Sequence, residues 1–262
     1  MAKDRVESGR GGGRRQPVKQ ARKSNKGPFY AIAALIAALG IATLLYLVNN
    51  RGGTAVATLD PNLPPVKAVG YTMGDPNAPV EIIEFADFEC PGCGQFAMVT
   101  EPDIRKNLIE TGQARFRFLD FPVNSSHVNS LTASLAAGCA HDQGKFWQMH
   151  DLIFQTQGEW STPYTDNPRK VMDRLAGQLG LNMQQYTECM DSKKYQANVK
   201  ANAEEAARVG AGSTPSFLIG GKIYTGGSYD MLKQAVDEAR AKVTPGAGAS
   251  TAAAPASDST PK

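Results

Sequence analysis

The sequence predicts an α/β fold in which a block of helices interrupts a sheet. Three observations predict it: a strand–helix–strand pattern over residues 79–121, helical spacing from about residue 129 to 208, and a strand pair followed by a helix at 216–243. Short apolar runs rich in β-branched side chains indicate strands, whereas apolar residues every three or four positions indicate helices. This order of elements is typical of an α/β sheet with a helical insertion.

The first strand, helix and second strand are each marked by a local pattern. Residues 79–85 (PVEIIEF) form a short apolar run that ends just before a cysteine. The residues that follow have helical spacing and end at Gly112, while Pro102 within them predicts a kink or a break because proline cannot donate a helical hydrogen bond. Residues 114–121 (ARFRFLDF) alternate as a second strand.

The later elements complete the sheet. After the helical block, strands predicted at 216–219 and 222–225 flank Gly220-Gly221, a dipeptide typical of a tight hairpin turn. The segment YDMLKQAVDEARAKV then predicts a closing helix. We therefore expect one domain at residues 68–243, with a helical insertion at about 124–208.

The two segments that flank this domain lack the apolar residues of a core. Residues 49–67 are rich in Gly, Pro and Asn, and we predict that they form a linker. Residues 244–262 are almost all Ala, Thr, Pro, Gly and Ser, which cannot offset the entropy of ordering. A disordered tail is therefore expected there.

A basic arm and an uncharged segment precede the linker. The arm, residues 1–28, carries about +7 of charge, so the remainder of a chain with net charge +3 is acidic. Residues 29–48 contain no charged residue, and twenty residues are about the length of a helix that crosses the ~30 Å hydrocarbon core. We predict one transmembrane helix. The alternative is a cleaved signal peptide, because AVA at 55–57 resembles a cleavage site.

The distribution of charge predicts an orientation for this helix. Basic residues are concentrated before it, which places the N-terminus in the cytoplasm and the domain on the periplasmic, extracytoplasmic side of a bacterial cytoplasmic (inner) membrane. The arm is expected to bind anionic membrane lipid. Nucleic acid is not an expected partner, because no Trp or Phe is interleaved with the charges of the arm.

Cys90 and Cys93, separated by Pro91 and Gly92, stand where the first helix of the domain is predicted to begin. A helix start stabilises a thiolate through free backbone N–H groups and the positive end of the helix dipole. Proline suits the first helical position, and Cys93 lies three residues on, within disulfide reach. We predict that Cys90 is the accessible nucleophile and Cys93 its resolving partner.

A C-x₂-C pair is also typical of half a zinc site or of a structural disulfide. Zinc needs four ligands, and no second C-x₂-C or H-x₃₋₅-H appears at the spacing of a zinc finger, so the fold would have to gather the others. A disulfide between residues three apart closes a very small loop and stabilises little. A redox centre without metal or cofactor is therefore the prediction.

With EIIEFADFECPGC followed far downstream by GSTPSFLIGG, the domain resembles the DsbA-like branch of the thioredoxin superfamily over roughly residues 70–240. These proteins are extracytoplasmic thiol–disulfide oxidoreductases in which a helical domain is inserted into a thioredoxin fold. The segment GKFWQMHDLIF in the insertion and Thr214-Pro215 before a late strand add to the resemblance. The resemblance implies that fold here.

The resemblance also implies roles for single residues. Pro215 matches a cis-proline that faces the CxxC, and the backbone of Thr214 matches the element that pairs with a bound peptide in mixed disulfides. Glu84 matches a buried acid that assists proton transfer, although as an ordinary strand residue it would reach water. Oxidases of the family often carry Pro-His between the cysteines, whereas this chain has Pro-Gly, so we expect only a moderate lowering of the Cys90 pKa.

Cys139 and Cys189 fall in helical segments of the insertion. Because extracytoplasmic chains seldom keep buried thiols reduced, we predict a second, structural disulfide between them. It would close a loop of about 50 residues and contribute roughly 4 kcal/mol in the chain-entropy model. The alternative is two buried free thiols that act as small apolar residues.

The predicted function is that of a dithiol oxidase that introduces disulfides into exported, cysteine-containing proteins. The family implies reoxidation by a quinone-linked membrane partner of the DsbB or VKOR type. A disulfide reductase or isomerase of the same fold is the alternative. A module that binds copper or zinc is a third class.

Overall fold

The computed structural model describes residues 27–49, 56–60, 62, 64–123 and 126–243. The predicted tail lies outside these residues, as does all but the end of the basic arm. The chain divides into two compact units, Met1–Gly53 and Thr54–Lys262.

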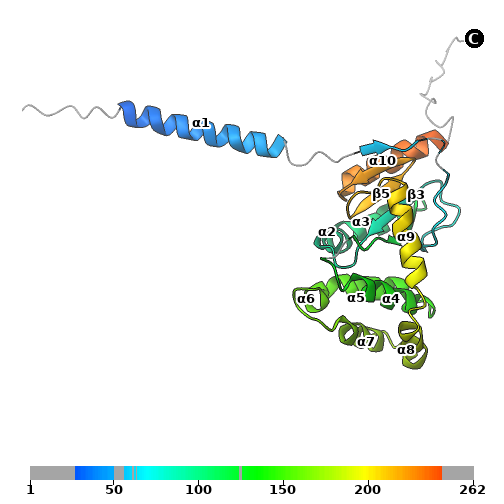
Figure 1. Ribbon diagram of the computed structural model, residues 1–262. Helices are drawn as coiled ribbons and strands as arrows, with labels where there is room; N and C mark the ends of the chain where they lie inside the picture. Colours follow the sequence, from blue (N-terminus) through cyan, green and yellow to red (C-terminus); the bar gives the residue numbers. More distant parts are fainter. Residues whose placement is uncertain (1–26, 50–55, 61, 63, 124–125, 244–262) are drawn as a thin grey trace, which may run out of the picture. The chain divides into compact units, whose positions relative to one another are not determined.

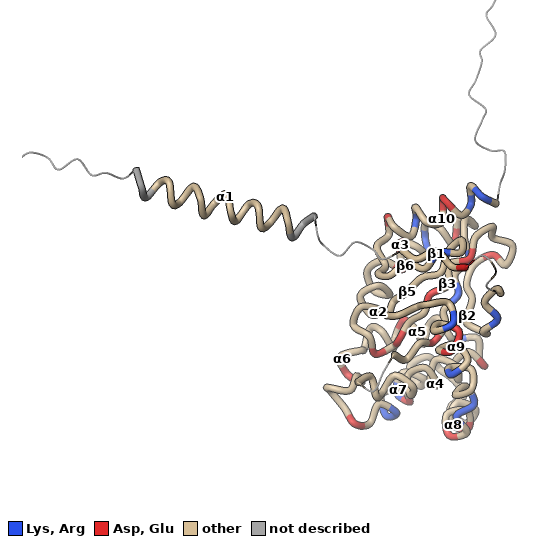
Figure 2. The backbone as a smooth tube through the Cα atoms, turned by 45° about the horizontal axis from the view of Figure 1, so that its top comes forward, with Lys and Arg blue, Asp and Glu red and all other residues tan. Residues whose placement is uncertain are grey.

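The first unit contains helix α1, Gly27–Asn49. Figure 2 shows no Lys, Arg, Asp or Glu along its described length, and the large apolar side chains described between Tyr30 and Tyr46 are all exposed. Among the described residues, no helix is both long and apolar enough to cross a membrane. A helix at the predicted place is confirmed, and a membrane span is not.

The second unit is built on a mixed sheet. Its strands are β1 Val56–Thr58, β2 Tyr71–Met73, β3 Glu81–Ala86, β4 Arg115–Asp120, β5 Ser216–Ile219 and β6 Lys222–Thr225. Within the described residues they lie in the order β1-β6-β5-β3-β4-β2. The pair β3 and β4 is parallel, and the other neighbouring pairs are antiparallel. The predicted strands at the two ends of the domain therefore meet in the centre of one sheet.

The helical run after β3 mixes α-helical and π-helical turns. Its parts are α2 Pro91–Gln95, η1 Phe96–Thr100, α3 Glu101–Ile104 and η2 Arg105–Ile109. Pro102 lies in the first turn of α3, and the N–H of Glu101 just before it bonds to the carbonyl of Phe96, five residues back. The disturbance predicted at Pro102 is thus a change of helical hydrogen bonding, and the run continues past it.

The insertion and the closing helix complete the unit. The helices are α4 Ser130–His141, α5 Phe146–Gln155, α6 Gln157–Trp160, α7 Pro168–Gln178, α8 Met183–Asp191, α9 Gln196–Arg208 and α10 Tyr229–Val243. Figure 1 shows α4 to α8 grouped at one end of the unit, with α9 running from them back alongside the strands. Because α9 packs on β4 as well as on α4, it joins the insertion to the sheet.

The apolar core lies on both faces of β3. Since side chains alternate along a strand, Ile82 and Ala86 enter the larger core beneath α2 to α5, and Ile83 and Phe85 enter a smaller core on the side of α9. Glu84 shares the face of Ile82 and Ala86. Its side chain therefore points into the larger core, where it is 1% exposed.

Two short strands lie where the sequence predicted none. Val56–Thr58, part of the predicted linker, forms β1 on β6, and Tyr71–Met73 forms β2 on β4. A three-residue strand has too few positions to show a period of two, and it forms because a sheet edge offers backbone partners. The prediction of a linker over residues 49–67 was therefore wrong at Val56–Thr58.

Cys139 and Cys189 form a disulfide between α4 and α8, with an S–S distance of 2.01 Å and a Cα–Cα distance of 5.8 Å. The predicted pairing is confirmed. Cys90 and Cys93 are unbonded, so the structure shows the reduced form of the predicted redox centre.

Candidate active site

Cys90 occupies the N-cap position of α2, at the end of a tight turn that follows β3. Its N–H bonds to the carbonyl of Asp87 at 3.0 Å, and its own carbonyl accepts the N–H of Gly94 at 3.1 Å. Pro91 takes the first helical position, where no N–H is needed. The backbone at Cys90 is extended, with φ −70° and ψ 122°, so its side chain lies beside the free N–H groups of the first turn. The predicted helix start at Pro91 is confirmed.

The Thr214–Pro215 peptide bond is cis and lies against this turn, as the resemblance implied. The two segments meet because β5, which begins at Ser216, pairs with β3 and places Ser216 opposite Phe85. When it is protonated, the Cys90 thiol donates to the carbonyl of Thr214 at 3.5 Å. A bound extended peptide would therefore find backbone partners at Thr214 directly beside the sulfur.

The two active-site thiols lie in different electrostatic surroundings. A hydrogen bond from Cys93, opposed by partial burial and assisted by Thr214 and the backbone of Gly92 and Cys93, lowers the Cys90 pKa to about 5. Burial, together with the same hydrogen bond and the charge of Glu84, raises the pKa of Cys93 well above its ordinary range. At neutral pH the pair therefore holds one thiolate at Cys90 and one proton at Cys93.

Glu84 lies buried on the core side of β3, close enough to the cysteines for mutual electrostatic effects. Burial, with the charge of Glu101, raises the Glu84 pKa well above its ordinary range. Its Oε2 atom has no hydrogen-bond partner among the described residues. A protonated Glu84 fits this setting, because an unpaired buried carboxylate would be far more costly. The expectation of a buried acid at this position is confirmed.

Two further acids close to the cysteines in sequence, Asp87 and Glu89, form hydrogen bonds to groups other than the two thiols. Asp87 accepts the N–H groups of Glu89 and Val123 and bonds to His127 and to the Ser130 hydroxyl. These bonds hold the Asp87 carboxylate against the start of the insertion. Asp87 therefore has a structural role beside the active-site turn.

Glu89 completes the same link. Its Oε2 accepts the N–H of Asn129 at 2.9 Å, and its Oε1 accepts the N–H of Thr162. Both partners belong to the insertion, so the carboxylate ties the active-site turn to the helical domain.

Gln157 is a site residue that sequence reasoning missed. Its Nε2 donates to the carbonyls of Phe88 at 2.8 Å and Cys90 at 3.0 Å, which fixes the turn that carries Cys90. A Cβ at Gly94 would lie 2.7 Å from the Gln157 Oε1 atom, so glycine is needed there for this contact. Only the approach of the insertion to the turn could have revealed this role.

One group among the described residues has the composition of a metal site: Glu101, His150 and Asp151, whose ligand atoms all lie within 4.8 Å of one another. Arg105 already bonds to Glu101 and to both carboxylate oxygens of Asp151. Its positive charge disfavours a metal ion at the same place. The chemistry that the structure supports best is thiol–disulfide exchange at Cys90 and Cys93.

Comparison with known proteins agrees with this geometry. The family model described as thioredoxin matches residues 67–238. Among solved structures, alpha-DsbA1 of Wolbachia pipientis superposes with a TM-score of 0.59 at 22% identity, over 70% of this chain and 95% of that one. At that identity the likeness shows the fold, a thioredoxin-like sheet with a helical insertion.

Two relatives in sequence belong to different classes of protein, one named for disulfide bond formation and the other for Na(+)/H(+) antiport. The probable disulfide bond formation protein D of Bacillus anthracis is 25% identical over 83% of this chain and 98% of that protein. The Na(+)/H(+) antiporter NhaA 3 of Salinispora tropica is 30% identical over 60% of this chain, and the match covers 22% of that protein. The chain thus spans about a fifth of the antiporter's length but nearly all of the disulfide bond formation protein.

Proposed function

This chain belongs to the thioredoxin family, and from that premise we propose that it is a DsbA-like thiol–disulfide oxidoreductase. The observation that carries the proposal is the asymmetry of the cysteine pair. Cys90 is half-buried with its pKa lowered to about 5, whereas Cys93 is fully buried with a raised pKa. One sulfur is prepared to be attacked and to leave, and the other is prepared to hold a proton.

The geometry supports exchange in two steps. A substrate thiolate attacks the Cys90 sulfur of the oxidised enzyme, the S–S bond breaks, and Cys93 leaves and takes a proton. A second substrate thiolate then attacks the mixed disulfide, and Cys90 leaves as a thiolate that its low pKa stabilises. The substrate leaves as a disulfide after losing two electrons, and the enzyme retains them as a dithiol.

The direction that we propose is oxidation of exported, cysteine-containing proteins. A thiolate stabilised at Cys90 favours the reduced enzyme, and this makes the disulfide form an oxidant. The name of the Bacillus anthracis relative agrees with this direction. A quinone-linked membrane protein of the DsbB or VKOR type is the proposed reoxidant, and a reductase or isomerase of the same fold is the alternative.

The proposed location is the extracytoplasmic face of a bacterial cytoplasmic membrane, with α1 as a single-pass anchor and anionic lipid at the basic arm. The absence of charge over residues 29–48 and the nine basic residues before them support this proposal. Alkaline carbonate extraction of membranes tests it, because an anchored chain stays in the pellet. Release of full-length chain into the supernatant would contradict it.

The reduction potential of the Cys90–Cys93 pair tests the proposed direction. The chain is equilibrated in glutathione buffers, and alkylation followed by mass spectrometry separates this pair from Cys139 and Cys189. We expect a value near ~−120 mV, as for a strong oxidant, rather than near ~−270 mV, as for thioredoxin. A value near the latter would favour the reductase alternative.

A further inference from the structure

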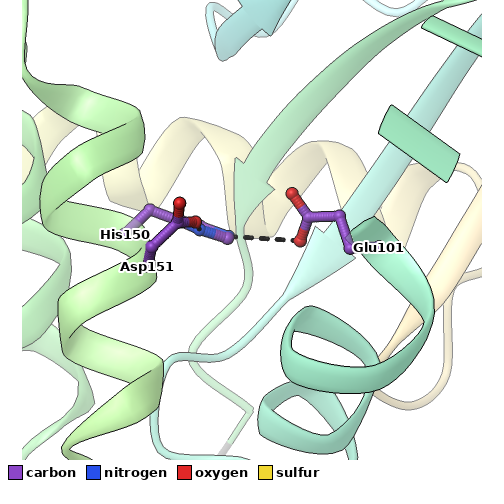
Figure 3. Close-up of side chains that lie close together, drawn as sticks. All are labelled: Glu101, His150 and Asp151. Carbon is purple, nitrogen blue, oxygen red and sulfur yellow. Dashed lines mark hydrogen bonds and ion pairs between the residues drawn. The ribbon is translucent and has the colours of Figure 1, made fainter. Parts of the chain in front are cut away.

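A second buried acid lies in the larger core, opposite a buried histidine. Figure 3 shows Glu101 of α3 and His150 of α5 pointing toward each other. The Oε2 atom of Glu101 and the Nε2 atom of His150 are 3.8 Å apart, both side chains are at most 1% exposed, and neither atom has a hydrogen-bond partner among the described residues. Two such polar atoms facing each other in a core need a physical explanation.

The remaining polar atoms of this cluster are already bonded. Arg105 donates to Oε1 of Glu101 at 2.8 Å and to the two oxygens of Asp151 at 3.0 and 2.6 Å. The Nδ1 atom of His150 lies 2.9 Å from Oδ1 of Asp151, so it carries the proton of that bond. Within the part of the chain that the structure describes, Oε2 of Glu101 and Nε2 of His150 thus face only each other.

A single proton on either of these two atoms would remove the repulsion between them. With Nδ1 protonated, a neutral His150 presents a lone pair at Nε2, and a carboxylate at Glu101 presents another. Two acceptors that face each other in a low-dielectric core repel, whereas one proton on either atom makes them a donor and an acceptor. A metal ion would also serve, but Arg105 already supplies the positive charge and occupies three of the four carboxylate oxygens.

Aromatic rings surround His150 and leave few other partners for the proton. The ring centroids of Phe154, Phe118 and Trp147 lie 4.9, 5.2 and 5.2 Å from that of His150. On the outer side, the Asp151 side chain is 51% exposed, so the His150–Asp151 bond leads from the core to solvent. The proton is therefore shielded on the core side and accessible through one carboxylate.

The same cluster lies beside the buried acid of the active site. Phe118, which contacts His150, is the β4 residue in register with Glu84 on β3. Glu84 faces the same core, and its Oε2 is also without a partner among the described residues. The two acids influence each other, since the charge of Glu101 contributes to the raised Glu84 pKa.

We propose that Glu101 and His150 hold one exchangeable proton that resupplies Glu84 from solvent through Asp151. This inference rests on the proposed function, in which Cys93 takes a proton as it leaves, and on the role in proton transfer that the resemblance implies for Glu84. Glu101 and His150 act through Glu84 and do not touch the substrate. They are positioning residues for the proton that the exchange reaction consumes.

The proposed sequence balances in protons and electrons. When a substrate thiolate attacks Cys90, the electron pair of the broken S–S bond goes to the Cys93 sulfur, which takes the proton of Glu84. The Glu101–His150 pair returns a proton to Glu84 and regains one from solvent at Asp151. The enzyme gains two electrons and one proton, and the substrate loses two electrons and releases its thiol protons.

The test is the rate at which dithiothreitol reduces the oxidised full-length chain, measured by quenched flow with thiol alkylation between pH 5 and 8. The variants are Glu101→Gln and His150→Gln, with Glu159→Gln as a matched control in an exposed carboxylate of the insertion. The ratio of variant to wild-type rate is compared at each pH, which cancels the titration of the reagent. The charged and titratable groups around the pair are Glu84, Arg105 and Asp151.

We expect reduction of Glu101→Gln and of His150→Gln to be about tenfold slower than that of wild type above pH 7. At pH 5, where solvent supplies protons readily, their rates should approach the wild-type rate. The control stays near wild type throughout. In Glu101→Gln, ¹³C NMR of the Glu84 carboxyl should show a lowered pKa, because a negative charge has been removed. A merely structural role would slow the reaction equally at all pH values.

A ratio of variant to wild-type rate that does not change with pH in folded variants, or an unchanged Glu84 pKa in Glu101→Gln, would overturn the proposal. If the buried substitutions unfold the chain, Asp151→Asn interrupts the path at its exposed end and is expected to give the same pH-dependent ratio. Zinc retained stoichiometrically by the wild type and lost in His150→Gln would also overturn it. The dithiothreitol assay measures proton supply to Glu84 without a natural substrate. Failure of the chain to oxidise reduced substrate proteins would therefore reject the proposed function, while the dithiothreitol rates would still decide the role of Glu101 and His150.

Discussion

The two cysteine pairs of this chain lie in different regions and have different chemistry. Cys139 and Cys189 are both buried, 50 residues apart, and bonded across two helices of the insertion. Cys90 and Cys93 are three residues apart at a helix start, one half-buried and the other buried, and they are unbonded. The thiol is the same in all four, so its surroundings determine whether a pair holds the fold together or exchanges electrons.

The difference has a physical basis. A bridge between distant residues restricts the unfolded chain strongly, whereas a bridge three residues long restricts it little. At the helix start, backbone N–H groups, Thr214 and Cys93 stabilise one thiolate, and this lowers the cost of breaking the bond there. We therefore expect changes at Cys139 and Cys189 to affect stability and changes at Cys90 and Cys93 to affect exchange.

The largest expected effect is the loss of exchange in Cys90→Ser. Without the sulfur that the substrate attacks and that then leaves, oxidation of a reduced substrate protein should fall by on the order of 10³-fold or more. The matched variant Cys93→Ser, mixed instead with a substrate protein that carries a disulfide, should accumulate a mixed disulfide through Cys90, because the Cys90 thiolate breaks the substrate disulfide and no Cys93 thiol resolves the product. A non-reducing gel shows this adduct. Accumulation through Cys93 in Cys90→Ser would reverse the assigned roles.

Removal of the other pair should act on stability. Cys139→Ala with Cys189→Ala opens the loop and is expected to lower the free energy of unfolding by about 4 kcal/mol in the chain-entropy model. Urea denaturation measures the change, and the single variant Cys139→Ala should lose nearly as much. A loss of exchange per folded molecule, with stability retained, would break the distinction between the pairs.

The stability of the reduced protein should depend on pH through Cys90, whereas the bonded Cys139 and Cys189 do not titrate. The Cys90 pKa falls from 9.0 to about 5 on folding, so its contribution to the stability of the reduced fold is complete above pH 9 and is lost as the pH falls through 5. Thiolate absorbance near 240 nm measures the titration. Denaturation of the reduced wild type and of Cys90→Ala should differ most at high pH, and a difference that grows toward pH 5 would refute the assignment.

The smallest predicted effect comes from Gly92. A Cβ there would lie 3.4 Å from Pro215 Cδ and 3.6 Å from the Cys90 sulfur, so a side chain fits and reaches the thiolate. Gly92→His should lower the Cys90 pKa by about one unit and raise the reduction potential by roughly 30 mV. Gly92→Ala controls for packing and should leave both near wild type. A lowered potential in Gly92→His would show that the ring does not stabilise the thiolate.

Local pattern was sufficient for the helix start and the hairpin. Pro91 after Cys90 and the Gly220-Gly221 turn carry their own signals, because proline and glycine limit the backbone within a few residues. Phe85 and Phe118 were likewise identifiable as strand residues from their apolar runs. The positions of β1 and β2 were not, since three-residue strands form only on an edge that another part of the chain provides.

The sequence by itself determined the fold class and identified Cys90–Cys93 as the candidate redox pair and Cys139–Cys189 as the candidate disulfide, because each depends on patterns or spacings along the chain. Tertiary structure decided the protonation of Glu84 and the bonding of Gln157 to the active-site turn. It also decided that Glu101 and His150 face each other. Burial, hydrogen bonding and the field of distant charges arise only when segments far apart in sequence meet, and these fix where protons reside.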